Sequence, residues 1–238
     1  AYKKALSTYF KKKAKQVSKV KKTHVDSFSK ESPIQKSTKP LNIAIKPKVW
    51  RKMAKELSRK FRSMPGLMTG QLGFEVEHIT TYIVNSEGTK AVKEPVIYSV
   101  GIHASTRADD GMMLTQGATR YARSAATLPS RKELEGMVDA VMRDLAALRE
   151  APVLEPYTGP AILEPEAAGV FFHETIGHRL EGERQNDEQE GQTFKGQIGS
   201  SILPGFITVR DDPTARKIET VELNGYYPFD DQAVPARN

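Results

Sequence analysis

A change in hydrophobic periodicity constrains the fold of this chain more than any other feature. Across residues 70–122, apolar and polar residues alternate, and β-branched and aromatic side chains lie between turn signals. This pattern is typical of strands that bury one face. The expected strands cover residues 74–84, 96–106 and 112–121. The connections between them are short, and parallel strands need long crossovers, so we predict an antiparallel meander.

Helical patterns flank the predicted sheet. Ser130 and Glu133 have the spacing of a capping box, and an apolar stripe of helical period follows them. An earlier helix is expected to begin near Pro47, because proline suits the first turn, and to end near Met64. A third helix is expected to begin near Pro165 and to run toward residue 181. The sequence therefore predicts an α+β fold in which helices cover an antiparallel sheet and one helix carries a metal-binding motif.

The chain is expected to contain three regions. These are a basic helical segment and linker (1–45), an α+β middle domain (46–155) and the start of a catalytic domain (156–238). Short strands are predicted at 161–163 and 202–209, and the polar, glycine-rich stretch 183–200 is expected to be a mobile loop.

Positive charge is concentrated near the start of the chain. The net charge is +7, and lysine and arginine cluster at 11–22 and 51–62. An amphipathic helix that includes part of the first cluster is predicted by the helical spacing of Leu6, Tyr9, Phe10, Val17 and Val20. Such clusters can bind phosphates, but aromatic residues are not interleaved for base stacking, so we favour a solvated helix face over nucleic-acid binding. No apolar run reaches eighteen residues, so we expect a soluble chain without a membrane partner.

One short segment has the residues of a hydrolytic metal site. It reads VFFHETIGHRLEGE at 170–183 and places Glu174 directly after His173, with a second histidine at His178. In zinc peptidases, two neutral imidazoles hold the ion and an adjacent carboxylate takes a proton from the attacking water. The chain has no cysteine, so a metal within it must be held by His, Asp or Glu. We therefore predict His173 and His178 as zinc ligands and Glu174 as the general base.

The spacing of the two histidines imposes a structural condition. Their pattern is His-Glu-x-x-x-His, one residue longer than the familiar His-Glu-x-x-His. At about 100° per residue, positions five apart on an α-helix diverge by about 140° and cannot share one ion. We therefore predict a π-bulge, located near Gly177, that returns His178 to the face of His173. The alternative at this point is that the two histidines are unrelated.

Several quoted stretches resemble one family. These are GVFFHETIGHRLEGE, SILPGFITVRDDP at 201–213 and FDDQAVPAR at 229–237, together with TYIVNSEGTK at 81–90 and the ADDG turn. They resemble the TldD/PmbA family of metallopeptidases, and in particular its TldD-like branch that retains His-Glu-x-x-x-His. The resemblance covers about two thirds of the chain. The first 45 residues have no counterpart in it.

The resemblance implies an activity, a ligand set and an assembly. It implies hydrolysis of unfolded or short peptides in a closed chamber formed by a homodimer or by two related subunits. Its third metal ligand is a cysteine in a downstream C-terminal domain, whereas this sequence has no cysteine. We therefore expect these residues to be a piece of a longer protein and to be inactive alone, with zinc held weakly or absent. A non-catalytic peptide-binding subunit is the rival interpretation. The expected location is the cytoplasm, although the residues themselves do not identify the compartment.

Other polar residues have simpler interpretations. Glu181 could be a substitute ligand, but an outer carboxylate that fixes a histidine tautomer is favoured. His78 and His103 lie on expected strands, where ordinary histidines are favoured. The aspartate pairs at 211–212 and 230–231 could line a groove, but turn formation is favoured.

Overall fold

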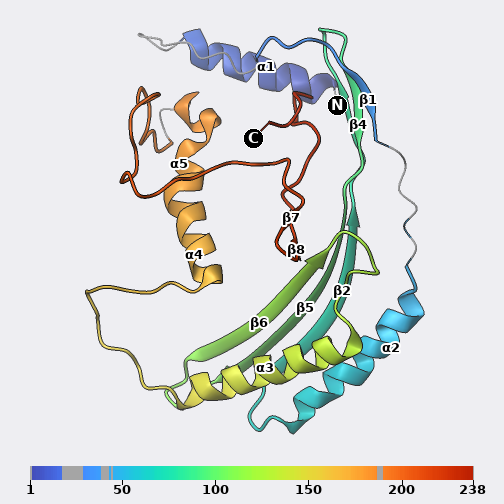
Figure 1. Cartoon of the computed structure of the whole chain (residues 1–238), viewed down its shortest axis with the longest axis vertical. Helices are drawn as coiled ribbons and strands as arrows, with labels where there is room; N and C mark the ends of the chain where they lie inside the picture. The colour runs from blue at the N-terminus through green and yellow to red at the C-terminus, as the bar shows by residue number, and fades with distance from the viewer. Residues whose placement is uncertain (1, 18–28, 39–42, 44, 187–189, 238) are drawn as a thin grey trace. The chain divides into compact units, whose positions relative to one another are not determined.

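The computed structural model describes residues 2–17, 29–38, 43, 45–186 and 190–237 (Figure 1). The chain forms two compact units. The histidine unit consists of Ala1–Lys30 and Gly159–Thr208, and the sheet unit consists of Glu31–Thr158 and Val209–Asn238. The division into three regions at residues 45 and 155 stays a prediction.

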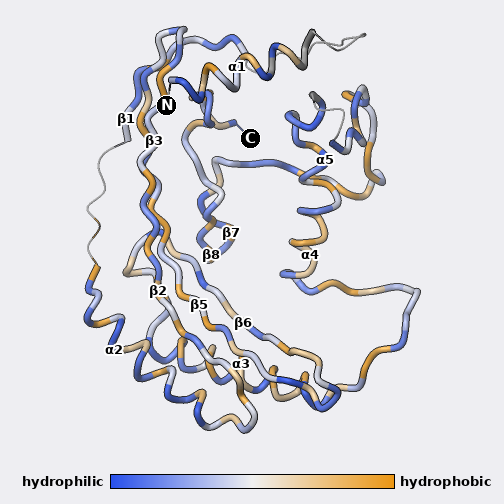
Figure 2. The backbone as a smooth tube through the Cα atoms, turned by 180° about the vertical axis from the view of Figure 1, so that it is seen from behind, coloured by the Kyte–Doolittle hydropathy of each residue, from blue (hydrophilic) through white to orange (hydrophobic). Residues whose placement is uncertain are grey.

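The main sheet of the sheet unit has three antiparallel strands. They are β2 (Thr69–His78), β5 (Val96–Arg107) and β6 (Met113–Ala122), and β5 lies in the centre. In register, Leu72 pairs with Ile102, which in turn pairs with Ala118. Hydrophobic and hydrophilic positions alternate along these strands (Figure 2), so the sheet has one apolar face, as the sequence predicts.

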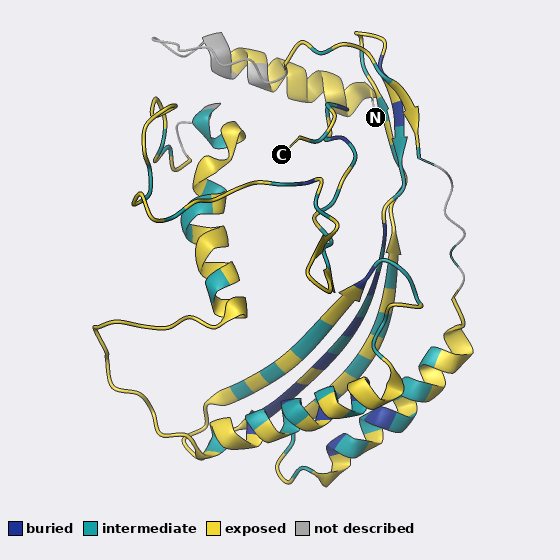
Figure 3. Cartoon of the chain, viewed as in Figure 1, coloured by how far each residue is buried: buried dark blue, intermediate teal, exposed yellow. Residues whose placement is uncertain are grey.

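Helix α3 (Arg131–Glu150) covers that apolar face. Its buried residues are Leu134, Val138, Val141 and Leu145. They pack with alternate residues of β5, including Val100 and Ile102, which are fully buried. Figure 3 shows buried positions along this strand. The Ser130 hydroxyl accepts the N–H of Glu133 and the Glu133 carboxylate accepts the N–H of Ser130, so the predicted capping box is confirmed.

A second helical segment packs beside α3. Helix α2 (Pro47–Leu57) begins with proline in its first turn and continues as the 3₁₀ helix η1 (Ser58–Ser63). Leu57 and Phe61 are buried in the same core. The prediction of a helix from Pro47 is thereby confirmed.

A smaller sheet completes the sheet unit. Strand β4 (Lys90–Lys93) pairs antiparallel with β3 (Thr81–Val84) and parallel with β1 (Gln35–Ser37). Phe229 and Ala233 from the end of the chain are buried against Ala91 of β4. The two-residue strands β7 (Lys217–Ile218) and β8 (Val221–Glu222) form a short hairpin.

The histidine unit is mainly helical. Helix α1 covers Tyr2–Val17. The second part contains α4 (Pro165–Phe172), the π-helix η2 (His173–Gly177), α5 (His178–Leu180) and the 3₁₀ helix η3 (Gly182–Asn186). Of the residues described in this unit, none is buried (Figure 3).

The α+β class is confirmed, but some expected strands are wrong. The meander is interrupted, because β3 and β4 leave the main sheet and pair in the smaller one. The expected strand at 202–209 is instead a turn, in which the N–H of Ile207 donates to the carbonyl of Pro204. The expected strand at 161–163 is absent as well, since it lies between Pro160 and Pro165 without a partner strand. Whether the histidine helix covers the sheet stays a prediction.

Candidate metal centre

The histidine segment widens where the spacing requires it. Helix α4 ends at Phe172 and the π-helix occupies His173–Gly177. The N–H of His178 donates to the carbonyl of His173, five residues back, which is the π-type hydrogen bond. The predicted π-bulge is therefore confirmed.

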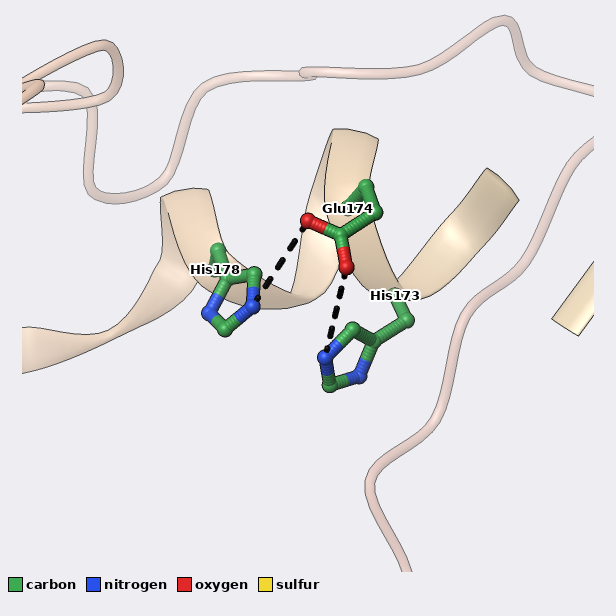
Figure 4. A group of neighbouring side chains, drawn as sticks. All are labelled: His173, Glu174 and His178. Carbon is green, nitrogen blue, oxygen red and sulfur yellow. Dashed lines mark ion pairs between the residues drawn. The ribbon is translucent and has the colours of Figure 1, made fainter. Parts of the chain in front are cut away.

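The π-turn brings three side chains to one side of the helix. The ring centroids of His173 and His178 are 4.5 Å apart, and the ring planes meet at 73°. Glu174 lies between them (Figure 4), with one carboxylate oxygen 3.8 Å from Nε2 of His173 and the other 3.8 Å from Nε2 of His178. This arrangement favours the interpretation of the two histidines as parts of one site over that of unrelated histidines.

The side chain of Thr175 bonds to the backbone beside the widened turn. Its hydroxyl donates to the carbonyl of Phe171 at 2.7 Å. A threonine hydroxyl makes the same bond to the carbonyl four residues earlier in regular helices, so the contact is compatible with both helix types. The sequence analysis missed this bond, although a threonine within a predicted helix is the signal for it.

A carboxylate outside the triad contacts His178. Oε1 of Glu181 lies 2.6 Å from Nδ1 of His178, and Oε2 accepts the Nε–H of Arg184 at 2.6 Å. The Arg184 hydrogen bond, followed by the His178 hydrogen bond, holds the pKa of Glu181 below its ordinary value. An ionised carboxylate only accepts, so Nδ1 of His178 is the donor in this contact, and in the neutral imidazole Nε2 is then the unprotonated nitrogen that can bind a metal. This contact favours the outer-carboxylate interpretation of Glu181 over that of a substitute ligand.

The three side chains form a group that could hold a metal ion. One ligand atom from each of His173, Glu174 and His178 lies within 4.8 Å of the others. Zinc binds imidazole nitrogen at about 2.0–2.1 Å, so two nitrogen ligands of one ion lie roughly 3.3 Å apart, which is shorter than that limit. The site is open, since 65% of the His173 side chain, 60% of Glu174 and 34% of His178 are accessible to solvent.

The other singled-out residues lie in the sheet unit. His78 ends β2 and His103 lies on β5, both exposed. Asp212 accepts the N–H and the hydroxyl of Thr214, and these bonds lower its pKa. Asp230 accepts the N–H groups of Gln232 and Val234. Both aspartates therefore form turns, as favoured by the sequence.

The two basic clusters differ in how their lysines are paired. The lysines described on α1 are exposed, whereas in the second cluster Lys60 contacts Asp139 and Lys52 contacts Glu56. Nucleic-acid binding is not tested by these contacts, and its absence stays a prediction. Among the residues that the structure describes, no helix is both long enough and apolar enough to cross a bilayer.

The fold and the histidine segment together describe an α+β chain that carries a His-Glu-x-x-x-His motif. Residues 156–238 match the family model described as the PmbA/TldA metallopeptidase C-terminal domain. The resemblance to the TldD/PmbA family inferred from the sequence is thereby confirmed.

Named relatives agree with this assignment. A metalloprotease of Methanocaldococcus jannaschii is 40% identical over 78 residues, which are 32% of this chain and 15% of that protein. A protein of Haemophilus influenzae named metalloprotease TldD homolog is 32% identical over 110 residues, which are 44% of this chain and 21% of that protein.

Two solved structures share the fold. A Bacteroides thetaiotaomicron protein described as a candidate modulator of DNA gyrase has a TM-score of 0.59 at 14% identity, covering 99% of this chain and 53% of the other. TldE from Thermococcus kodakarensis has a TM-score of 0.52 at 19% identity, covering 90% and 48%. At these identities the likeness concerns the fold alone. The present chain thus spans about half the length of the solved structures that it matches.

Proposed function

We propose that this chain contributes the His-Glu-x-x-x-His part of a zinc-dependent peptidase site. His173 and His178 are the proposed metal ligands and Glu174 is the proposed general base. The observation that carries the proposal is the π-turn, which places two imidazoles and one carboxylate on the same side of a helix. The names of the relatives as metalloproteases support the same reaction class.

Each proposed residue has a task that its position allows. When bound, a zinc ion polarises the peptide carbonyl and lowers the pKa of water to about 7. His173 and His178 contribute neutral nitrogens, and the hydrogen bond to Glu181 keeps the proton of His178 on Nδ1. Glu174, 3.8 Å from both rings, takes the proton of the attacking water on a carboxylate oxygen. The same oxygen then delivers that proton to the leaving amine, as general acid–base catalysis requires.

The remaining ligand, the substrate and the assembly belong to the same proposal. Structural zinc sites use four protein ligands and catalytic sites use three, so two histidines alone bind weakly. The family resemblance supplies a downstream cysteine as the third ligand, and we expect this chain to be inactive without it. We further propose short or unfolded peptides as substrates, a homodimer or a pair of related subunits as the assembly, and a cytoplasmic location.

The test compares Glu174→Gln with wild type in the full-length protein. Glutamine keeps the shape of the side chain but cannot take the proton, so we expect the rate of peptide cleavage to fall by about 10²- to 10⁴-fold with zinc content unchanged. Glu166→Gln is the matched control, because Glu166 lies in the first turn of the same segment. We expect this variant to cleave like wild type.

Two results would contradict the proposal. Equal cleavage by wild type and Glu174→Gln would remove Glu174 as the base. No zinc and no cleavage in the full-length wild type would favour the rival interpretation, a peptide-binding subunit without activity.

A further inference from the structure

The carboxylate that contacts His178 is itself held by a second charged group. Arg184 donates its Nε–H to Oε2 of Glu181 at 2.6 Å, while Nη1 of the same guanidinium donates to Glu190 at 3.3 Å. The guanidinium therefore bridges two carboxylates. A planar group with fixed donor directions restricts the rotation of both partners, which the point charge of a lysine does not do.

The backbone of Arg184 is anchored as well. It lies in η3, and the side-chain amide of Gln192 donates to the carbonyls of Arg184 and Gln185 at 3.2 and 3.1 Å. The Arg184 side chain is 32% accessible, compared with 60% for Glu174. Arg184 is thus anchored through both its side chain and its backbone carbonyl.

The geometry points to an effect on His178. A neutral imidazole carries its proton on either nitrogen, and the hydrogen bond at one nitrogen decides which. Oε1 of Glu181 is 2.6 Å from Nδ1 of His178, and Nε2 is the nitrogen that lies on the side of Glu174. If Glu181 were free to rotate, the proton could move to Nε2 and block the atom that faces the proposed metal.

We propose that Arg184 is a positioning residue that acts through Glu181 to hold His178 in the Nδ1–H tautomer, with Nε2 open toward His173 and Glu174. The expected consequence, tighter metal binding, rests on the proposed function. The effect on the tautomer of His178 does not depend on that function. Partners that orient a metal-binding histidine typically change metal affinity by 10- to 100-fold when they are lost.

The test measures the tautomer and the metal affinity separately in the full-length protein. Side-chain ¹⁵N NMR of metal-free, histidine-labelled protein, with His178→Gln used to assign the signal, reports which nitrogen carries the proton. We expect the Nδ1–H tautomer in wild type and a shift toward Nε2–H in Arg184→Met. Competition with a chelator should show zinc bound about tenfold more weakly by Arg184→Met, with Arg184→Lys between the two proteins.

Matched variants separate positioning from damage to the fold. Arg179→Met removes an arginine of the same segment whose described contact is a 3.4 Å bond to Thr193, and it should leave both readouts unchanged within twofold. Glu190→Gln should also shift the tautomer of His178 toward Nε2–H, but by a smaller fraction. This variant tests the same role if Arg184→Met lowers the melting temperature of the protein.

The outcomes distinguish this inference from the proposed function. An unchanged tautomer in both Arg184→Met and Glu190→Gln overturns the positioning role, whatever the zinc affinity. A shifted tautomer in a protein that binds no zinc supports the positioning role and overturns the proposed function.

Discussion

The sheet unit and the histidine unit differ in how they bury their apolar side chains. In the sheet unit, Leu134, Val138 and Ile102 are fully buried in a core between α3 and the main sheet. In the histidine unit, no described residue is buried, and Phe171 and Phe172 remain 50% and 40% exposed. Burial of a large apolar side chain contributes about 1.5–3 kcal/mol. The sheet unit is therefore stabilised mainly by burial, whereas the described part of the histidine unit depends on local hydrogen bonds.

This difference explains how the candidate site obtains its geometry. The relative positions of His173 and His178 follow from the π-turn within one short segment, without side chains from a core. A core substitution in the sheet unit should thus change stability, whereas substitutions in the segment should change metal binding.

The largest expected contrast is in hydrogen exchange. In the 238-residue chain, amides of β5 such as those of Val100 and Ile102 should exchange only by global opening, because they lie in the buried core. Amides of α4 should exchange by local opening. A difference of about 4 kcal/mol between the two openings corresponds to roughly a thousandfold in protection. Mass spectrometry of the exchanged chain measures this difference in protection. Equal protection in β5 and α4 would contradict the proposed difference in stability between the two units.

A core truncation in the sheet unit should have the next largest effect. Leu134 is fully buried on α3, so Leu134→Ala should lower the free energy of unfolding by about 2–5 kcal/mol through lost burial and a residual cavity. Urea denaturation followed by circular dichroism measures this change. Leu148→Ala, at an exposed position near the end of the same helix, is the control and should cost much less. A large loss of zinc affinity in folded Leu134→Ala would contradict the separation.

Removal of the α3 cap should have an intermediate effect. In Ser130→Ala, the N–H of Glu133 loses its acceptor, and the expected loss in the free energy of unfolding is about 1 kcal/mol. Ser130→Asp keeps an acceptor at the cap and should restore most of it. If both variants unfold at the wild-type urea concentration, the capping box does not contribute to the stability of the sheet unit.

Acid should weaken the same cap. Hydrogen bonds from Ser130, first from its side chain and then from its backbone, lower the pKa of Glu133. A carboxylate with a lowered folded pKa contributes stability that is complete above its unfolded pKa, about 4.3, and is lost as the pH falls through the folded value. The urea midpoint should therefore decrease below about pH 4, and less steeply in Glu133→Gln. Identical pH profiles for the two proteins would rule out this contribution.

Local sequence signals account for the parts of the fold that could be predicted. Pro47 and the pair Ser130 and Glu133 fix helix starts within a few residues, and alternation identifies β5 and its neighbours. The parallel pair β1 and β4 was missed, because each strand has only three or four residues and its partner is more than fifty residues away. The strand expected at 202–209 was wrong, because Pro204 and Gly205 interrupt an otherwise strand-like run.

Some features of the candidate site could likewise be predicted from the sequence, and others could not. The π-turn could be predicted because the five-residue histidine spacing allows no regular helix to bring both rings together. The contact between Glu181 and His178 was anticipated from their three-residue spacing. Arg184 was missed, since it lies in a polar stretch interpreted as a loop, and its bond to Glu190 joins positions six apart, a spacing that no regular helix or strand predicts.

The smallest expected effect concerns Gly177, at the end of the π-helix. The sequence favoured this glycine as the origin of the distortion, but its φ of −52° is open to any residue. A Cβ there would meet only the carbonyl of Phe172, at an ordinary 3.8 Å. Gly177→Ala should therefore keep the π-turn, leave zinc affinity of the full-length protein within about twofold of wild type and gain at most about 1 kcal/mol of local helix stability. Chelator competition measures the affinity. A loss of tenfold or more would show that the widened turn needs the glycine itself, and the histidine geometry would then depend on backbone freedom in addition to the hydrogen bonds of His178 and Thr175.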